Sequence, residues 1–463
     1  MTSIDKIARA PVTATPENHL AAELTETIRL AAPMALTQLG QIAMMTTDLA
    51  FIGRLGDEAV AAAALGHTVF FISFTFGLGL VSAVAPLAAQ AFGARDPRQV
   101  RRAVRTGLWA ALLVSIPTLI LPLRGEQILV ALGQAPESAR LGQQYLFGLA
   151  WGIAPALWFI TIRSFMGAVN RPEPILWITL AAVPANALLV YLLLYGKWGL
   201  PELGLFGAGL ATTIVNIATF VAGLCFVMWR RPFRKYHILA RLWRIDWPLL
   251  RQLLAIGAPI SLSLLMEYGL FSSAALLMGL ISTAALAAHQ VALQVTAILF
   301  MVPLGIGMAA TVRVGHAFGR RHADAVRRAG FTALWLGIAL AAALTIAVIF
   351  WRFGIAALFF GSATTHGAIE LTAALLLVGA TYFITDAIQT IVAGALRGLS
   401  DTRVPLLLAV VSYWLIGFTL ACVLGFKTSL GAVGVWIGLS CGTAVYAAAL
   451  ILRFRRLANR LGA

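Results

Sequence analysis

Thr381–Gly398 reads TYFITDAIQTIVAGALRG, an apolar helical segment that carries one carboxylate, Asp386. Tyr382 lies four residues before Asp386 and Gln389 lies three after it, so the three side chains share one face of a helix. A carboxylate at membrane depth costs about 2.5–3.5 kcal/mol, and such groups usually line a pathway. The stretch therefore predicts a membrane-spanning helix with a functional site in it.

The composition of the whole chain is that of a polytopic helical membrane protein. Of its 463 residues, 60% are hydrophobic and only 11% are charged, whereas soluble domains carry about 25% charged residues. An outer-membrane barrel is excluded because the apolar segments run for about 20 residues or more without strict alternation. The net charge of +16 resides in short loops, so we expect the bilayer as a partner and no nucleic acid.

Hydropathy predicts twelve membrane-spanning helices. Their approximate ranges are 29–53, 58–92, 103–123, 142–166, 173–196, 203–229, 249–279, 284–318, 329–351, 368–396, 404–425 and 430–452. Joins after even-numbered helices are rich in Arg and Lys, and joins after odd-numbered helices hold few. By the positive-inside bias, both termini are expected in the cytoplasm of a bacterial-type inner (plasma) membrane. The polar N-terminus lacks the pattern of a cleaved signal peptide.

The two halves of the chain repeat each other at an ungapped shift of 226 residues. This shift aligns Ala32-Pro33 with Ala258-Pro259, and Ala91-Phe92-Gly93 with Ala317-Phe318-Gly319. Six helices per copy is an even number, so the copies share one orientation about an axis along the membrane normal. We predict an all-α membrane protein of two pseudo-symmetric six-helix lobes around a central cleft. The predicted units are a cytoplasmic N-terminal tail (1–27), an N-terminal lobe (28–229), a basic linker (230–248), a C-terminal lobe (249–453) and a basic tail (454–463).

Only three of the 18 acidic residues fall well inside the predicted helices: Asp48, Glu267 and Asp386. Together they cost about 8–10 kcal/mol, which a structural role alone rarely justifies. No Arg or Lys lies comparably deep in the sequence to pair with Glu267 or Asp386. Asp48 lies near the outer end of its helix, where it could also be a solvated acid.

Each deep acid has polar neighbours at helical spacing. These neighbours are Gln38 and Gln41 before Asp48, Ser263 before Glu267, the pair Gln290 and Gln294 on the eighth helix, and Asn186 after Pro184 on the fifth. Carboxylate, phenol and amide oxygens are hard ligands for Na⁺, and a buried carboxyl group can also carry a proton. Gln290 and Gln294 are equally typical of contacts between helices.

The sequence contains no motif of an enzyme. GxSxG, HExxH, Walker A and CxxC are all absent, and Cys225, Cys422 and Cys441 lie in apolar segments as packed thiols. We expect no enzymatic activity and no cofactor. Because the chain carries no ATPase domain, the energy for any transport would come from an ion gradient or a separate partner.

The motifs resemble those of the multidrug and toxic compound extrusion (MATE) antiporters, and most closely the NorM-like subgroup. The matching pieces are TTDLAFIGRLG (46–56), YGKWGLPELGLFGAG (195–209), AAHQVALQ (287–294) and DAIQTIVAGALRGLSDT (386–402), within a resemblance that covers about residues 28–455.

The resemblance implies that Glu267, Asp386 and Tyr382 form a cation-coupling site in the C-terminal lobe, with Na⁺ as a hypothetical ligand. It also implies an acidic site in the N-terminal lobe formed by Asp48 and Asn186. Gln290 falls where NorM-like proteins contact substrate. The expected substrate-binding residues are Gln41, Gln290, Gln294 and Gln389. Some family members carry acids in the ninth-to-tenth join, whereas residues 353–367 contain none.

These observations predict a secondary-active efflux antiporter that exports amphipathic organic cations in exchange for Na⁺ or H⁺, working as a monomer. Carboxylates serve both ions, so the sequence leaves Na⁺ and H⁺ open. The alternative is a lipid-linked oligosaccharide flippase of the same superfamily, which would need a cationic cavity. A membrane-embedded enzyme and a channel are the remaining alternatives.

Overall fold

The computed structural model describes residues 16–360 and 366–461, and every regular element in these ranges is a helix. The first half contains α1 (Pro16–Ile52), η1 (Gly53–Leu55), α2 (Asp57–Ser82), α3 (Val84–Gly93), α4 (Pro97–Leu123), α5 (Gly125–Ala131), α6 (Pro136–Ala150), α7 (Ile153–Ala168), α8 (Glu173–Tyr195) and α9 (Gly204–Trp229). The second half contains η2 (Phe233–Tyr236), α10 (Trp247–Ile281), α11 (Thr283–Gly319), α12 (Ala323–Phe360), α13 (His366–Gly398), α14 (Arg403–Ala409), η3 (Val410–Phe418), α15 (Thr419–Phe426) and α16 (Gly431–Arg460).

These helices account for the twelve predicted crossings. Within the described ranges, ten helical segments are long and apolar enough to cross a membrane, and the α6–α7 pair, bent by 44°, makes an eleventh. α1 is more polar because it carries Gln38, Gln41 and Asp48, but it packs along α8 and α11 as part of the bundle. The expected all-helical membrane fold is confirmed.

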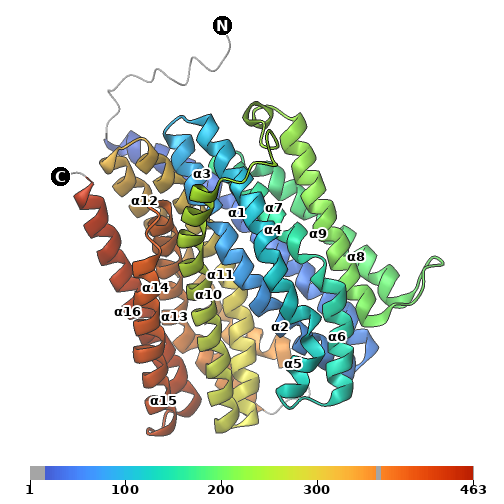
Figure 1. The fold of residues 1–463 in the computed structure, drawn as a ribbon. Coiled ribbons are helices and arrows are strands. Elements are labelled where there is room, and N and C mark those ends of the chain that lie inside the picture. The colour runs from blue at the N-terminus through green and yellow to red at the C-terminus, as the bar shows by residue number, and fades with distance from the viewer. Residues whose placement is uncertain (1–15, 361–365, 462–463) are drawn as a thin grey trace.

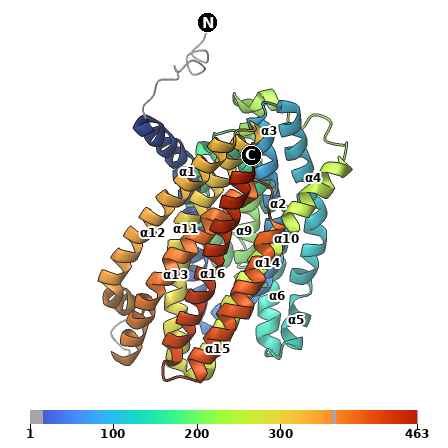
Figure 2. The same ribbon diagram turned by 90° about the vertical axis from the view of Figure 1, so that its left-hand side faces the viewer.

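The first turns of α1 and the last turns of α16 lie at one end of the bundle, which also holds the α3–α4 turn and the linker that contains η2 (Figures 1 and 2). We call this end the termini end. The short helix α5 and the α15–α16 turn lie at the opposite end. This arrangement agrees with an even number of crossings.

α1 begins well before the predicted start at residue 29. Residues 21–28 are mostly Ala, Glu, Leu and Thr, and Ala and Glu have a high intrinsic helix propensity. Arg313 of α11 also holds this extension, because its guanidinium forms an ion pair with Glu23 and a hydrogen bond to Thr27. Residues 16–27, which the sequence analysis assigns to a tail before the first lobe, are therefore helical, and Glu23 and Thr27 attach this part of α1 to α11.

Contacts between the two halves repeat under the 226-residue shift. Gly79 of α2 lies so close to Ser261 of α10 that an added Cβ would collide with the Ser261 backbone. The repeat-related pair, Gly305 of α11 and Ala35 of α1, is equally close. Nearer the termini end, the 226-residue shift relates two further glycine contacts in the same way: Gly93 with His316, and Gly319 with Gln90. The two halves therefore meet through equivalent surfaces, and these surfaces lie in direct backbone contact.

α13, which contains the opening stretch of the sequence, lies in the middle of the second half. It packs against α11, α12 and α16, and the buried side chains Leu376, Ile391 and Leu396 belong to the largest apolar core of the molecule. α13 passes Gly394 against Gly307 of α11 at a distance that leaves no room for a side chain. Any polar group on α13 in this region must therefore find its partners inside the protein.

Candidate cation-binding site

The structure brings Glu267 of α10 and Asp386 of α13 together through one amide. Nε2 of Gln389 donates a hydrogen bond to Oδ1 of Asp386 at 2.9 Å and lies 3.3 Å from Oε1 of Glu267. Asp386 and Gln389 are each only 4% exposed, whereas Glu267 is half-buried. Glu267 is 122 residues from Gln389 in the sequence and Asp386 is 3 residues from it, yet the two carboxylates form one acidic cluster.

Tyr382 lies one helical turn before Asp386 and is 2% exposed. It is close enough to both carboxylates to be affected by their charges. Its ring makes edge-on contacts with Phe271 of α10 and Trp436 of α16, with centroids 5.9 and 5.8 Å away. Trp436 in turn donates a hydrogen bond to Nδ1 of the buried His289, at 3.1 Å. Aromatic rings therefore fix the phenol beside the acids.

A small internal space adjoins Asp386. It has a volume of about 10 Å³ and is lined by α11, α12 and α13, including Pro303, Thr345 and Phe383. This volume corresponds to about one water molecule. Pro303 lies inside α11, where its missing N–H leaves a backbone carbonyl without its helical partner. The surroundings of Asp386 can thus accommodate one small polar species.

The negative charge of this cluster has no directly bonded basic partner among the described residues. The ion pairs among the described residues join Arg29 to Glu173, Arg102 to Asp246, Arg313 to Glu23 and Arg453 to Asp401, and none of these pairs includes Glu267 or Asp386. Two ionised carboxylates this close together in a largely buried site repel each other, so this arrangement favours a bound cation or a proton.

A second acidic group lies in the first half. Asp48 of α1 is 8% exposed and accepts hydrogen bonds from Nδ2 of Asn186 on α8 at 2.5 Å and from Oγ1 of Thr212 on α9 at 3.2 Å. Asp48 is therefore a buried group and not a solvated acid near the end of its helix. Oδ1 of Asn186 is buried and has no hydrogen-bond partner within the described chain. This free acceptor lies on the same side chain that binds the carboxylate.

The expected substrate-binding glutamines occupy different environments. Gln389 belongs to the acidic cluster, Gln41 and Gln294 are half-buried, and Gln290 is exposed. Their neighbour Gln38 is buried and accepts a hydrogen bond from Nη1 of Arg163 at 2.8 Å. The structure therefore does not gather the four glutamines into one cluster.

Several partners in these sites were not identified from the sequence. Thr212 binds Asp48, Arg163 binds Gln38, and Trp436 with His289 supports Tyr382. These contacts join residues 125 to 164 positions apart on different helices. Threonine and tryptophan are common in membrane helices, so periodicity gave no signal for them. Arg163 lies near the end of α7, and its side chain is only 8% exposed.

Comparison with known proteins places this fold and its buried acids in a class of membrane transporters. The MatE family model matches residues 33–192 and 259–423, which lie in the first and the second half of the helical bundle. The chain belongs to the MATE family, and it is a transporter and not an enzyme.

Individual relatives agree with this assignment. The chain is 67% identical over 464 residues to the "Probable multidrug resistance protein NorM" of Bradyrhizobium diazoefficiens, covering 100% of both chains. It is 57% identical over 436 residues to the protein of the same description from Rhodopseudomonas palustris, covering 94% and 92%. Among solved structures, "Outward-facing conformation of a multidrug resistance MATE family transporter of the MOP superfamily" matches with a TM-score of 0.86 at 20% identity, covering 95% of this chain and 96% of that one.

Proposed function

We propose that this multidrug transporter is a secondary-active antiporter that exports amphipathic organic cations in exchange for Na⁺ or H⁺. The observation that carries the proposal is the pairing of Glu267 and Asp386 on one amide with no bonded basic group among the described residues. Such a pair binds a cation in one step of the cycle and must give it up in another. Small-molecule substrates fit the description of the relatives as multidrug resistance proteins.

In this proposal Glu267, Asp386 and Tyr382 form the coupling site, and Gln389 is part of it. Glu267 is the accessible member because it keeps some exposed surface, whereas Asp386 lies behind it beside the small cavity. The amide of Gln389 satisfies both carboxylates when the ion is absent and turns away when the ion binds. The fixed aromatic surround of Tyr382 limits the size of the ion that fits.

Two binding events must oppose each other for exchange to occur. Cation binding favours one of two states of the transporter and substrate binding favours the other, by different affinities for the two states. One charge that moves through 100 mV supplies about 2.3 kcal/mol, which corresponds to about 50-fold accumulation. Ion coupling is concentrated in the second half, because the repeat places Gln41 opposite Glu267 at the shift of 226 residues. Further along the chain the shift becomes 231, as Gly167 with Gly398 and Pro174 with Pro405 show, and places Pro155 opposite Asp386.

The proposal also assigns the protein an orientation in the membrane and a conformational state. We assign the termini end to the cytoplasm, since the basic joins gather there. In the proposed cycle, the close glycine contacts between the halves, from Gly79 to Gly93 and their repeat partners, hold the two halves together toward that end in this state. We divide the chain into lobes at the linker 230–248 and treat one chain as the working unit.

The test uses the full chain in proteoliposomes under an imposed Na⁺ gradient and, separately, an imposed pH gradient, with efflux of a fluorescent organic cation as the readout. Asp386→Asn is expected to abolish gradient-driven transport by whichever ion drives the wild type. Glu370→Gln is the matched control, because Glu370 is an exposed acid at the start of the same helix. Undiminished transport by folded Asp386→Asn protein would falsify the assignment.

The flippase alternative makes a different prediction. A carrier of lipid-linked pyrophosphate needs a basic cavity at membrane depth, and the buried Arg163 is engaged by Gln38 instead. Translocation of a lipid-linked oligosaccharide by the same proteoliposomes, without any gradient-driven efflux of cations, would favour that alternative.

A further inference from the structure

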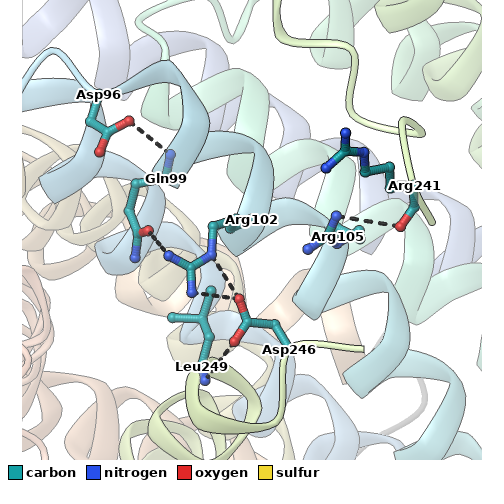
Figure 3. Close-up of polar contacts among 7 residues, drawn as sticks. All are labelled: Asp96, Gln99, Arg102, Arg105, Arg241, Asp246 and Leu249. Atoms are coloured by element: carbon teal, nitrogen blue, oxygen red, sulfur yellow. Dashed lines mark hydrogen bonds and ion pairs between the residues drawn. The ribbon is translucent and has the colours of Figure 1, made fainter. Parts of the chain in front are cut away.

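A basic pocket of about 800 Å³ lies at the termini end, between the start of α4 and the linker that leads into α10. Figure 3 shows part of its lining, with Arg102 and Arg105 on α4 next to Asp246 and Arg241 of the linker. This pocket is separate from the acidic cluster of Glu267 and Asp386, and it plays no part in the proposed antiport.

The pocket has a large excess of positive charge. Its lining contains six arginines, Arg98, Arg101, Arg102, Arg105, Arg241 and Arg244, and one acid, Asp246. Both oxygens of Asp246 are already engaged: Oδ2 binds Arg102 at 2.6–2.7 Å, and Oδ1 caps α10 by accepting from the Leu249 backbone N–H at 3.3 Å. The acid therefore leaves the other five guanidinium groups without a direct counter-charge.

Arg105 is the clearest case of an uncompensated charge. Its side chain is only 8% exposed, and its Nη1 donates to the backbone carbonyl of Arg241 at 3.3 Å. Its Nε is buried and has no hydrogen-bond partner in the described part of the chain. A buried guanidinium donor without an acceptor is unfavourable, so the site is incomplete without an anion.

The repeat shows that the fold does not require an arginine here. The equivalent of Arg105 in the second half is Phe331, whose ring packs against Phe454 with centroids 5.8 Å apart. Trp109 and Trp335 are also equivalent, but only Trp109 is tied to the linker, by donating to the carbonyl of Leu242 at 2.6 Å. Arg105 and the linker thus build a pocket that the other lobe lacks.

The surroundings of the pocket indicate a membrane–water interface. Trp243 is 80% exposed and Trp247, which lines the pocket, is 57% exposed. Exposed tryptophans of membrane proteins concentrate at the level of the lipid headgroups. Arginines bind phosphate oxygens with two parallel donors, and basic pockets of this kind in membrane proteins hold acidic headgroups.

We propose that this pocket binds the phosphate headgroup of an anionic phospholipid, with Arg105 as its innermost ligand. The phosphate accepts from the free Nε of Arg105, and the exposed arginines Arg98 and Arg244 neutralise the remaining charge. Because Arg105 and the linker both contribute, the bound lipid fastens the segment between the two halves onto α4.

The experiment titrates the detergent-purified full chain with short-chain phosphatidylglycerol or phosphatidylcholine and counts bound lipids by native mass spectrometry. Phosphatidylglycerol is expected to bind at least about tenfold more tightly, and Arg105→Gln to remove at least about tenfold of that affinity, as for a lost charge-assisted hydrogen bond. Arg328→Gln is the matched control, since Arg328 is exposed, lies at the same end and is the repeat equivalent of Arg102.

A second variant keeps the test decisive if Arg105→Gln does not fold. The double variant Arg98→Gln/Arg244→Gln changes only exposed side chains and is expected to weaken phosphatidylglycerol binding to a similar degree. Equal binding of both lipids, equal loss in Arg328→Gln, or full binding by the double variant overturns the proposal. Inorganic phosphate serves as the competitor, and its binding without any retention of phosphatidylglycerol would assign the pocket to a soluble anion and overturn the lipid assignment.

Discussion

Glu267 and Asp386 lie on different helices but share a single hydrogen-bond donor, Nε2 of Gln389, at 3.3 and 2.9 Å. In the proposed coupling site, this donor competes with the ion for the same oxygens. We therefore expect the strength of coupling to depend on the amide as well as on the two acids.

Gln389→Leu is expected to tighten cation binding and slow turnover. Without the amide, the ion-free carboxylates lose charge-assisted hydrogen bonds worth about 1.5–3 kcal/mol, so the cation becomes at least about tenfold harder to release. The measurement is the Na⁺ or H⁺ concentration for half-maximal efflux, together with the maximal rate. A higher half-maximal concentration in folded Gln389→Leu protein would contradict the role of Gln389 as a competing donor.

Asp48→Asn tests whether coupling belongs to the second half alone. Asp48 is held by Asn186 and Thr212, and the amide of the variant can accept from Asn186 through its oxygen and donate to the Thr212 hydroxyl through its nitrogen. We expect Asp48→Asn to retain transport that responds to the imposed ion gradient, at a reduced rate, whereas Asp386→Asn loses the response. The two variants are compared in the same proteoliposome assay, and loss of the gradient response in Asp48→Asn would show that both halves couple.

Gly79→Val is expected to separate the halves at one of the points where their backbones are in contact. The new side chain meets the Ser261 backbone, and overpacking of this kind costs about 1–3 kcal/mol. The closed contact is destabilised relative to a state that opens toward the termini end. Accessibility of a cysteine introduced at the exposed position Leu262 measures the shift, on a background without Cys225, Cys422 and Cys441. Gly354→Ala is the control, because nothing lies within 4 Å of an added Cβ there.

Trp436→Phe is expected to lower thermal stability without changing which ion drives transport. The substitution removes the hydrogen bond to His289 and leaves that buried imidazole nitrogen without its donor, at a cost of about 1–3 kcal/mol. The ring that supports Tyr382 is largely retained. Melting of the purified protein and gradient-driven efflux are measured in parallel, and a change in ion dependence would place Trp436 in the coupling site itself.

The sequence predicted the helices, their order and the deep acids because membrane spans and buried carboxylates leave strong local signals. Asp386 with Gln389 one turn away could be assigned to one face from spacing alone. Long-range partners could not be predicted, because Thr212 and Trp436 have no distinctive pattern and their contacts depend on how helices pack. The bends were also missed: η3 (Val410–Phe418) is a π-helix and α6 meets α7 at 44°, although hydropathy shows each as one continuous apolar segment.

The repeat-related contacts of Gly79 with Ser261 and Gly305 with Ala35 are those expected if the chain arose from two copies of one six-helix unit. A surface that binds its own repeat copy is self-complementary, as in a two-fold symmetric dimer. A single six-helix unit with this surface would pair with a second copy of itself in the same membrane orientation. In the single chain, Glu267 and Asp386 of one half correspond to the neutral residues Gln41 and Pro155 of the other. Two identical subunits of a symmetric dimer could not differ in this way.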